Sequence, residues 1–155
     1  MEILKVGNQC PVFEGVDQNN NVVTSDDFKG TKLVIYFYPK DNTPGCTAQA
    51  CSLRDGFDEL SKNNIRVLGV SADNVKSHDK FSTKFTLPFP LLADVEKSVI
   101  QKFGVWGPKK FMGREYEGIH RVSFVMDENG VIIHVIQKPK TKDHANEILG
   151  LLNLK

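Results

Sequence analysis

Two mainly apolar runs, KLVIYFY at residues 32–38 and IRVLGVSA at residues 65–72, place the strongest constraint on how this chain folds. Neither run alternates regularly with polar residues, so both are expected to be β-strands that are covered on both faces. A helix-like segment at residues 43–62 separates them. This strand–helix–strand order predicts an α/β sheet with helices packed against it.

The later segments extend this pattern. Residues 74–85 are typical of a helix that ends before the proline-rich sequence LPFP. Residues 122–136 form two apolar runs joined by DENG, which predicts a hairpin. The polar stretch at residues 17–30 predicts another hairpin and a loop, and residues 143–152 predict a closing helix with one apolar stripe. The order is that of a thioredoxin-like fold, with a central mixed sheet and helices on both faces.

Length and charge exclude several classes of protein. A chain of 155 residues suits one domain, so we expect residues 1–155 to form a single domain. The 20 basic and 19 acidic residues leave a net charge of +1, which gives no reason to expect a nucleic-acid or membrane partner. The N-terminus lacks a signal-peptide pattern, and three cysteines do not suit a secreted disulfide scaffold, so a cytoplasmic location is expected.

The segment NTPGCTAQAC at residues 42–51 carries two of the three cysteines. Thr43 is expected to be the N-cap of a helix, with Pro44 at the first helical position, where proline is favoured. Cys46 then lies in the first turn, close to unpaired backbone N–H groups and the positive end of the helix dipole. This position favours the thiolate form of the side chain.

The helix is expected to bury one face, formed by residues at positions 46, 50, 53, 57 and 60. Cys51 lies about 140° around the helix axis from Cys46, and the two Cα atoms of a regular helix are about 8.5 Å apart at this spacing. A disulfide requires less than about 7 Å. The two thiols therefore either never pair, or pair only when the first turns unwind.

Packing is the alternative role for each cysteine, because buried free thiols are common small apolar groups. We expect packing for Cys10, which precedes Pro11, and leave both roles open for Cys51. A zinc site is not expected, since no cysteine pair has zinc-ligand spacing with a histidine. The four histidines are expected to lie at the surface or to cap helices, and no nucleotide-binding motif is present. These are His78, His120, His134 and His144.

The sequence YPKDNTPGCTAQACSLRD resembles the active-site segment of the peroxiredoxins, whose signature is Pro-x-x-x-Thr-x-x-Cys. The spacing of the cysteine pair is similar to that of the peroxiredoxin Q, or bacterioferritin comigratory protein, subfamily. The similarity continues through SHDKFSTKFTLPFPLLAD, FGVWGPKKFMGREYEGIHRVSFVMDENG and HANEIL. It therefore covers nearly the whole chain.

The resemblance implies a thiol peroxidase that reduces hydrogen peroxide and organic hydroperoxides. Cys46 matches the peroxidatic cysteine and Cys51 the resolving cysteine. Thr43 matches the hydroxyl that contacts the peroxide, Pro39 the residue that shields the pocket, and Arg121 the arginine that holds the thiolate. A Cys46–Cys51 disulfide, recycling by thioredoxin or a similar dithiol, a monomeric state and no metal or organic cofactor are also implied.

One departure from the subfamily pattern is Gln49, where glutamate is common. The change removes a negative charge near the start of the helix, and it is expected to affect the thiolate or local unfolding. Two rival functions remain at this point. A thiol–disulfide oxidoreductase of thioredoxin type would reduce insulin without consuming peroxide, and a binding module or chaperone would not need Cys46 for chemistry.

Overall fold

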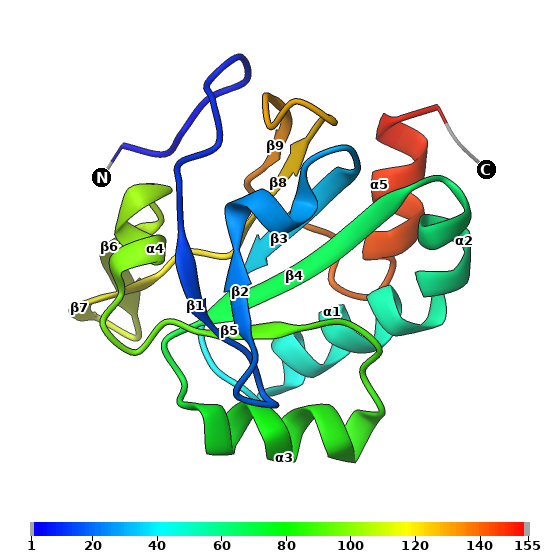
Figure 1. Ribbon diagram of the computed structural model, residues 1–155. Coiled ribbons are helices and arrows are strands. Elements are labelled where there is room, and N and C mark those ends of the chain that lie inside the picture. The colour runs from blue at the N-terminus through cyan, green and yellow to red at the C-terminus, as the bar shows by residue number, and fades with distance from the viewer. Residues whose placement is uncertain (1, 154–155) are drawn as a thin grey trace.

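A five-stranded mixed sheet with the strand order β5-β4-β3-β8-β9 forms the centre of the molecule (Figure 1). This computed structural model describes residues 2–153. The two apolar runs form β3 and β4, which are parallel, and the DENG hairpin forms β8 and β9, with β8 antiparallel to β3. The α/β class and the mixed sheet are thus confirmed. The strands are β3 (Lys32–Phe37), β4 (Ile65–Ser71), β5 (Leu91–Ala93), β8 (Val122–Met126) and β9 (Ile132–Ile136).

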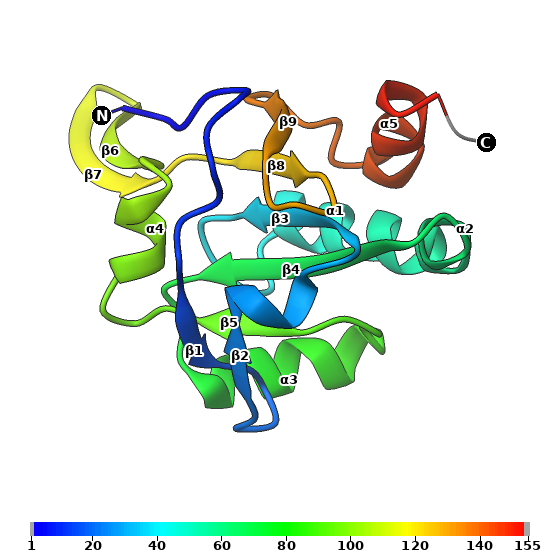
Figure 2. The same ribbon diagram turned by 45° about the horizontal axis from the view of Figure 1, so that its top comes forward.

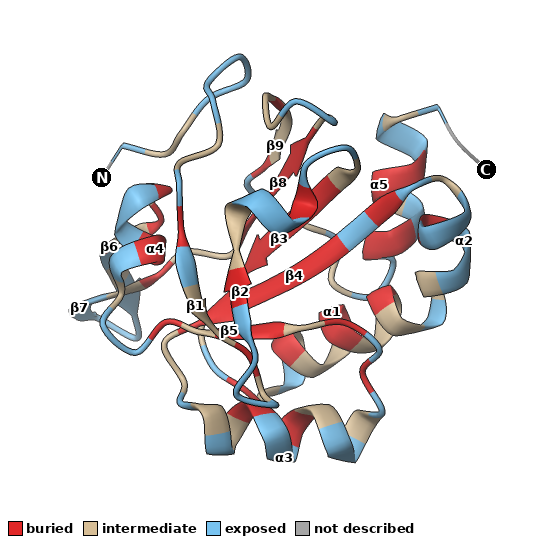
Figure 3. Ribbon diagram, viewed as in Figure 1, coloured by how far each residue is buried: buried red, intermediate tan, exposed pale blue. Residues whose placement is uncertain are grey.

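Alternating side chains of β3 are buried on opposite faces of the sheet, which explains its continuous apolar sequence. Figure 3 colours most of this strand as buried. Leu33, Ile35 and Phe37 belong to one core cluster, whereas Val34 and Tyr36 belong to the other. The four residues from Val34 to Phe37 have no exposed surface. The sheet therefore separates two apolar cores.

The core that contains Val34 and Tyr36 is covered by four helices, whose buried residues belong to the same cluster. The other core is covered by an N-terminal hairpin, a short 3-10 helix and one short α-helix. Helices thus lie on both faces, as expected, but the longer ones share one face. The first group is α1 (Pro44–Asp55), α2 (Phe57–Lys62), α3 (Val75–Phe85) and α5 (His144–Leu151). The second is β1 (Glu14–Val16), β2 (Val22–Thr24), η1 (Ser25–Phe28) and α4 (Ser98–Lys102).

The single helix predicted at residues 43–62 is wrong in one respect, because Gly56 divides it into α1 and α2. A Cβ atom at Gly56 would lie 2.4 Å from the Cβ of Ala145 in α5. Glycine therefore allows α5 to approach the end of α1 closely. The apolar stripe still continues across the break, since Leu53 and Leu60 are fully buried on either side of it.

A second hairpin, β6 (Trp106–Phe111) and β7 (Arg114–Ile119), was not predicted from the sequence. Its strands carry many charged residues and most of their positions are exposed, so no apolar alternation indicated them. Figure 1 and Figure 2 both place this hairpin beside α4. In agreement with this placement, the Nζ atom of Lys97, which precedes α4, lies 5.1 Å from the ring centroid of Trp106 in β6. Within residues 2–153, no helix has the length and apolar character needed to cross a membrane.

The expectation that the histidines lie at the surface or cap helices is wrong for His78, which is fully buried on α3. His144 does begin α5, but it is also fully buried. Its Nδ1 atom lies 2.9 Å from Oε1 of Glu147, and its Nε2 atom lies 2.8 Å from Oγ of Ser123. Hydrogen bonds of this kind satisfy ring nitrogens that burial would otherwise leave without partners.

His144 is expected to make folding sensitive to mild acid. Burial lowers the pKa of His144 below its ordinary value of about 6.5, because desolvation outweighs the attraction of Glu147. Below that ordinary value the unfolded chain binds more protons than the folded chain, so the free energy of unfolding falls as the pH decreases. Urea unfolding at pH 7.5 and pH 5.5 should show a smaller loss for His144→Gln than for the wild type. An equal loss in both proteins would contradict this assignment.

Candidate active site

The start of α1 is built as the sequence predicts. Thr43 is the N-cap, with φ −92° and ψ 157°, and Pro44 is the first helical residue. The Thr43 hydroxyl does not cap the helix, however, but donates to the carbonyl oxygen of Lys40 at 2.9 Å. Pro39 is half-buried at the beginning of the same loop, between β3 and α1. The hydroxyl of Thr43 is therefore held on the loop side of the helix start, where its hydrogen is donated to Lys40 and its oxygen can still accept.

Cys46 lies in the first turn of α1 with only 1% of its surface exposed, on the predicted buried stripe. The Nη2 atom of Arg121 donates to its Sγ atom at 3.2 Å. The contact joins residues 75 positions apart. The fold therefore holds a cationic hydrogen-bond donor directly against the buried sulfur.

The pairing of β3 with β8 explains why these two residues meet. Phe37 is the register partner of Val122. Arg121 directly precedes Val122, so it lies beside the end of β3, where the chain turns towards α1. Gly45 leaves space for the guanidinium group, because a Cβ atom there would lie 3.1 Å from Nη2 of Arg121.

Gln49 belongs to the site, although the sequence indicated it only as a departure from the subfamily pattern. It is fully buried, and its Oε1 atom accepts a hydrogen bond from Nη1 of Arg121 at 2.7 Å. The spacing could have revealed this role, since Gln49 lies three residues after Cys46 and thus one turn along the same helix. The Nε2 atom of Gln49 has no hydrogen-bond partner among the described residues.

Cys51 is half-buried on the same helix, and all three cysteines are free thiols. Because α1 runs from Pro44 to Asp55, both Cys46 and Cys51 lie within one helix. Regular helix geometry separates their Cα atoms by about 8.5 Å. The structure thus brings Cys46 together with Arg121 but does not place Cys51 within bonding range.

Two further ionisable groups lie around the thiol. Lys109 of β6 has a lowered pKa because of burial and the nearby charge of Arg121, while Cys46 acts in the opposite direction. Burial and the nearby Cys46 raise the pKa of Tyr36 well above its ordinary range. No sequence signal pointed to Lys109, since the hairpin that carries it was itself not predicted.

Cys10 packs on the opposite core from Cys46. It is half-buried, and burial raises the pKa of its thiol to about 11. At neutral pH this thiol is protonated and a poor nucleophile. The packing role expected for Cys10 agrees with this environment.

Comparison with known proteins identifies the family. Residues 6–135 match the model of the AhpC/TSA family. A putative peroxiredoxin bcp of Haemophilus influenzae is 50% identical over 152 residues, which is 98% of each chain. Peroxiredoxin Bcp of Escherichia coli is 47% identical, and the alignment covers 98% of this chain and 97% of that protein.

Solved structures agree with these relatives. A cysteine variant of Xylella fastidiosa PrxQ superposes with a TM-score of 0.88 at 30% identity, covering 99% of this chain and 98% of the other. A cysteine variant of Xanthomonas campestris peroxiredoxin Q gives a TM-score of 0.85 at 35% identity, with 91% and 90% covered. The chain therefore belongs to the AhpC/TSA family, as a peroxiredoxin of the Q, or bacterioferritin comigratory protein, type.

Proposed function

We propose that this peroxiredoxin reduces hydroperoxides through a thiolate at Cys46, with Arg121, Thr43 and Pro39 forming the peroxide site. The observation that carries the proposal is the 3.2 Å contact between Nη2 of Arg121 and the buried Sγ of Cys46. A cation held against a sulfur at a helix N-terminus prepares the nucleophile that peroxide cleavage needs. Both apolar cores pack against the same five-stranded sheet, which supports treating the chain as one catalytic domain.

The first step is attack of the thiolate on one peroxide oxygen. The S–O bond forms as the O–O bond breaks, and the leaving oxygen departs as an alcohol or water after it takes up a proton. Negative charge grows on that oxygen, so the guanidinium of Arg121 stabilises it in the transition state. The Thr43 hydroxyl donates its own proton to Lys40, so its oxygen is left to accept a hydrogen bond from the peroxide.

The second step joins the two cysteines. The Cys51 sulfur attacks the sulfenic acid on Cys46, the S–S bond forms and water leaves. This step requires the first turns of α1 to unwind, because the regular helix holds the Cα atoms too far apart. A thioredoxin-type dithiol then reduces the disulfide by exchange. The close cysteine pair, in a chain with three cysteines, supports action in a reducing cytoplasm, where such pairs are more often catalytic than structural. A monomeric state is proposed from the subfamily resemblance.

The substrates proposed are hydrogen peroxide and organic hydroperoxides. A solved structure of Xanthomonas campestris bacterioferritin comigratory protein, 35% identical to this chain, is described in terms of alkyl peroxide reduction with a trapped intermediate. The relatives from Haemophilus influenzae and Escherichia coli are named peroxiredoxins. These names support the proposed reaction class for this chain.

Single cysteine variants should separate the two steps. Cys46→Ser should abolish peroxide consumption, because no other thiol lies beside Arg121. Cys51→Ser should complete one turnover and then stop as the sulfenic acid. Cys10→Ser serves as the matched control and should keep wild-type turnover, since that thiol is protonated on the opposite core. Stopped-flow oxidation followed by mass spectrometry measures all three, and peroxide turnover by Cys46→Ser would contradict the proposed function.

Arg121 should act on both the thiolate and the transition state. Arg121→Ala is expected to lower the second-order rate constant for peroxide about 100-fold or more, as loss of one preorganised donor commonly does. The thiolate absorbance of the same variant, measured on the Cys51→Ser background, reports how much of the loss comes from protonation. Arg121→Lys keeps the charge but cannot donate to both Cys46 and Gln49 in a fixed fork, and it should recover only part of the rate. Wild-type rates in both variants would exclude Arg121 from the reaction.

Disulfide formation should loosen one defined segment. In hydrogen-exchange experiments, the oxidised protein should lose protection at residues 46–53, while β3 and β8 remain protected in both forms. The reason is that local opening of α1 leaves the sheet and the buried Leu60 of α2 intact. Equal protection of residues 46–53 in both forms, with the disulfide confirmed by peptide mapping, would show that no unwinding is needed.

A further inference from the structure

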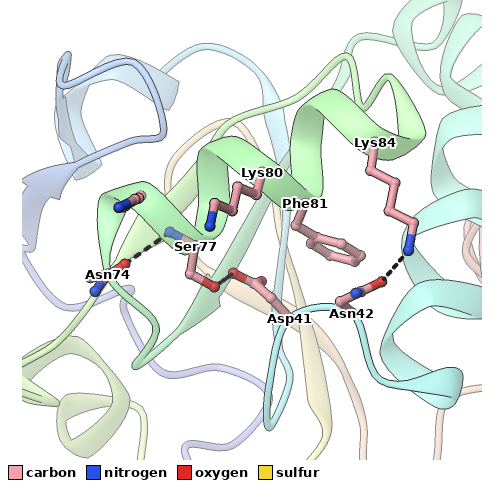
Figure 4. Close-up of a pocket in the computed structure, with 8 residues that line it drawn as sticks. Asp41, Asn42, Asn74, Ser77, Lys80, Phe81 and Lys84 are labelled. Atoms are coloured by element: carbon pink, nitrogen blue, oxygen red, sulfur yellow. Dashed lines mark hydrogen bonds between the residues drawn. The ribbon is translucent and has the colours of Figure 1, made fainter.

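The loop between β3 and α1 contains a buried carboxylate that the proposed chemistry does not use. The side chain of Asp41 is only 3% exposed. Its Oδ1 atom accepts a hydrogen bond from the hydroxyl of Tyr38 at 2.6 Å, and its Oδ2 atom accepts one from the hydroxyl of Ser77 at 2.8 Å. Figure 4 shows the carboxylate directed at Ser77 on α3. Asp41 thereby ties the loop to a helix beyond the active site.

His78 of α3 joins this network through both of its ring nitrogens. Its Nε2 atom lies 2.9 Å from the carbonyl oxygen of Leu92, and its Nδ1 atom lies 2.7 Å from Oδ2 of Asp41. A carbonyl oxygen only accepts hydrogen bonds, so Nε2 must carry a hydrogen. The contact between Nδ1 and Oδ2 links His78, which is fully buried, to Asp41, which is nearly so. Both ring nitrogens of His78 are thus held by hydrogen bonds, one of them to the carboxylate of the loop.

The main chain of the loop is fixed at the same residue. The backbone N–H of Asp41 donates to Oδ2 of Asp73 at 2.8 Å, and this oxygen also accepts from the hydroxyl of Ser71 at 2.7 Å. Asn42 follows with φ 61°, in the left-handed region, and Thr43 comes next. Both the side chain and the backbone of Asp41 are thus anchored two residues before Thr43.

We propose that Asp41 is a positioning residue of the peroxide site and that His78 is the hydrogen-bonded partner that holds its carboxylate in place. Held in this way, Asp41 sets the conformation of the loop that presents Thr43 and the first turn of α1, which carries Cys46. The inference rests on the proposed function. The anchors lie just after β3 (Tyr38), just after β4 (Asp73) and on α3, so they are outside the part of α1 that must unwind for disulfide formation.

Asp41, Asp73 and His78 could also be read as a cation site, because their ligand atoms lie within 4.8 Å of one another. Hydrogen bonds within the chain, however, already occupy both carboxylate oxygens of Asp41, the Oδ2 atom of Asp73 and both ring nitrogens of His78. Three lysines also line the groove beside Asp41, and their charge opposes a cation. Figure 4 labels two of them, Lys80 and Lys84. The three groups therefore act as an internal hydrogen-bond network. The lysines are Lys76, Lys80 and Lys84.

Two isosteric substitutions test the proposal. In the wild type, hydrogen-bond partners occupy both carboxylate oxygens of Asp41. Asp41→Asn keeps only one of these oxygens, so its NH2 group must face either the Tyr38 hydroxyl or the side chains of Ser77 and His78. Asp73→Asn is the matched control. The hydrogen bonds from Asp41 and Ser71 both reach the same oxygen of Asp73, and the amide oxygen of asparagine can take its place.

Both variants are made on the Cys10→Ser, Cys51→Ser background, so that Cys46 is the thiol that reacts. Two rate constants are measured for each, one for hydrogen peroxide and one for alkylation by iodoacetamide. Asp41→Asn should lower the peroxide rate by a factor of about 10 to 100, as loss of positioning does. Alkylation should stay the same or rise, because this reagent does not use Thr43. Asp73→Asn should keep both rates close to those of the parent protein.

An unchanged peroxide rate in Asp41→Asn would overturn the proposal, and so would parallel losses of peroxide and alkylation rates. The proposal would also be overturned if Asp73→Asn lowered the peroxide rate constant as much as Asp41→Asn does. If circular dichroism shows that Asp41→Asn does not fold, His78→Gln replaces it, since the carboxylate then keeps its Tyr38 and Ser77 donors. The same split between the two rates is expected for that variant. Failure of the parent protein itself to react with peroxide would instead reject the proposed function.

Discussion

The antiparallel pairing of β3 with β8 is the constraint on which the site depends. It places Arg121 beside the end of β3, from which the chain continues through the loop into α1 and Cys46. Because β3 is the central strand and is buried on both faces, this register cannot slip without moving apolar side chains out of both cores. The position of one guanidinium group relative to one sulfur is therefore fixed by the whole sheet.

The site combines rigid and opening parts. The loop before α1 is anchored by buried polar groups on its neighbours, whereas the first turns of α1 must leave their helical conformation for the cysteines to meet. On the proposed mechanism Cys46 belongs to both parts, since it reacts with peroxide while α1 is folded and with Cys51 after the first turns have unwound. The fold thus provides a fixed frame on one side of Cys46 and a movable segment on the other.

Much of this arrangement could be predicted from the sequence, because the deciding signals were local. The two-sided burial of β3, the cap at Thr43 and Pro44 and the buried stripe that starts at Cys46 all follow from residue type and spacing. The roles of Asp41 and His78 depend on contacts between distant segments, and a buried histidine has no distinctive local pattern. The β6–β7 hairpin, with Lys109, was missed because its strands are mostly exposed.

The Nε2 atom of Gln49, which has no hydrogen-bond partner among the described residues, bears on how the enzyme resists over-oxidation. The buried hydroxyl of Tyr36 on β3 also lacks a partner within residues 2–153. A buried polar atom without a partner costs about 1 to 3 kcal/mol. On the proposed mechanism, the Gln49 amide makes the closed α1 less stable, so the helix opens more readily once the sulfenic acid has formed. A second peroxide then has less time to convert that acid irreversibly into a sulfinic acid.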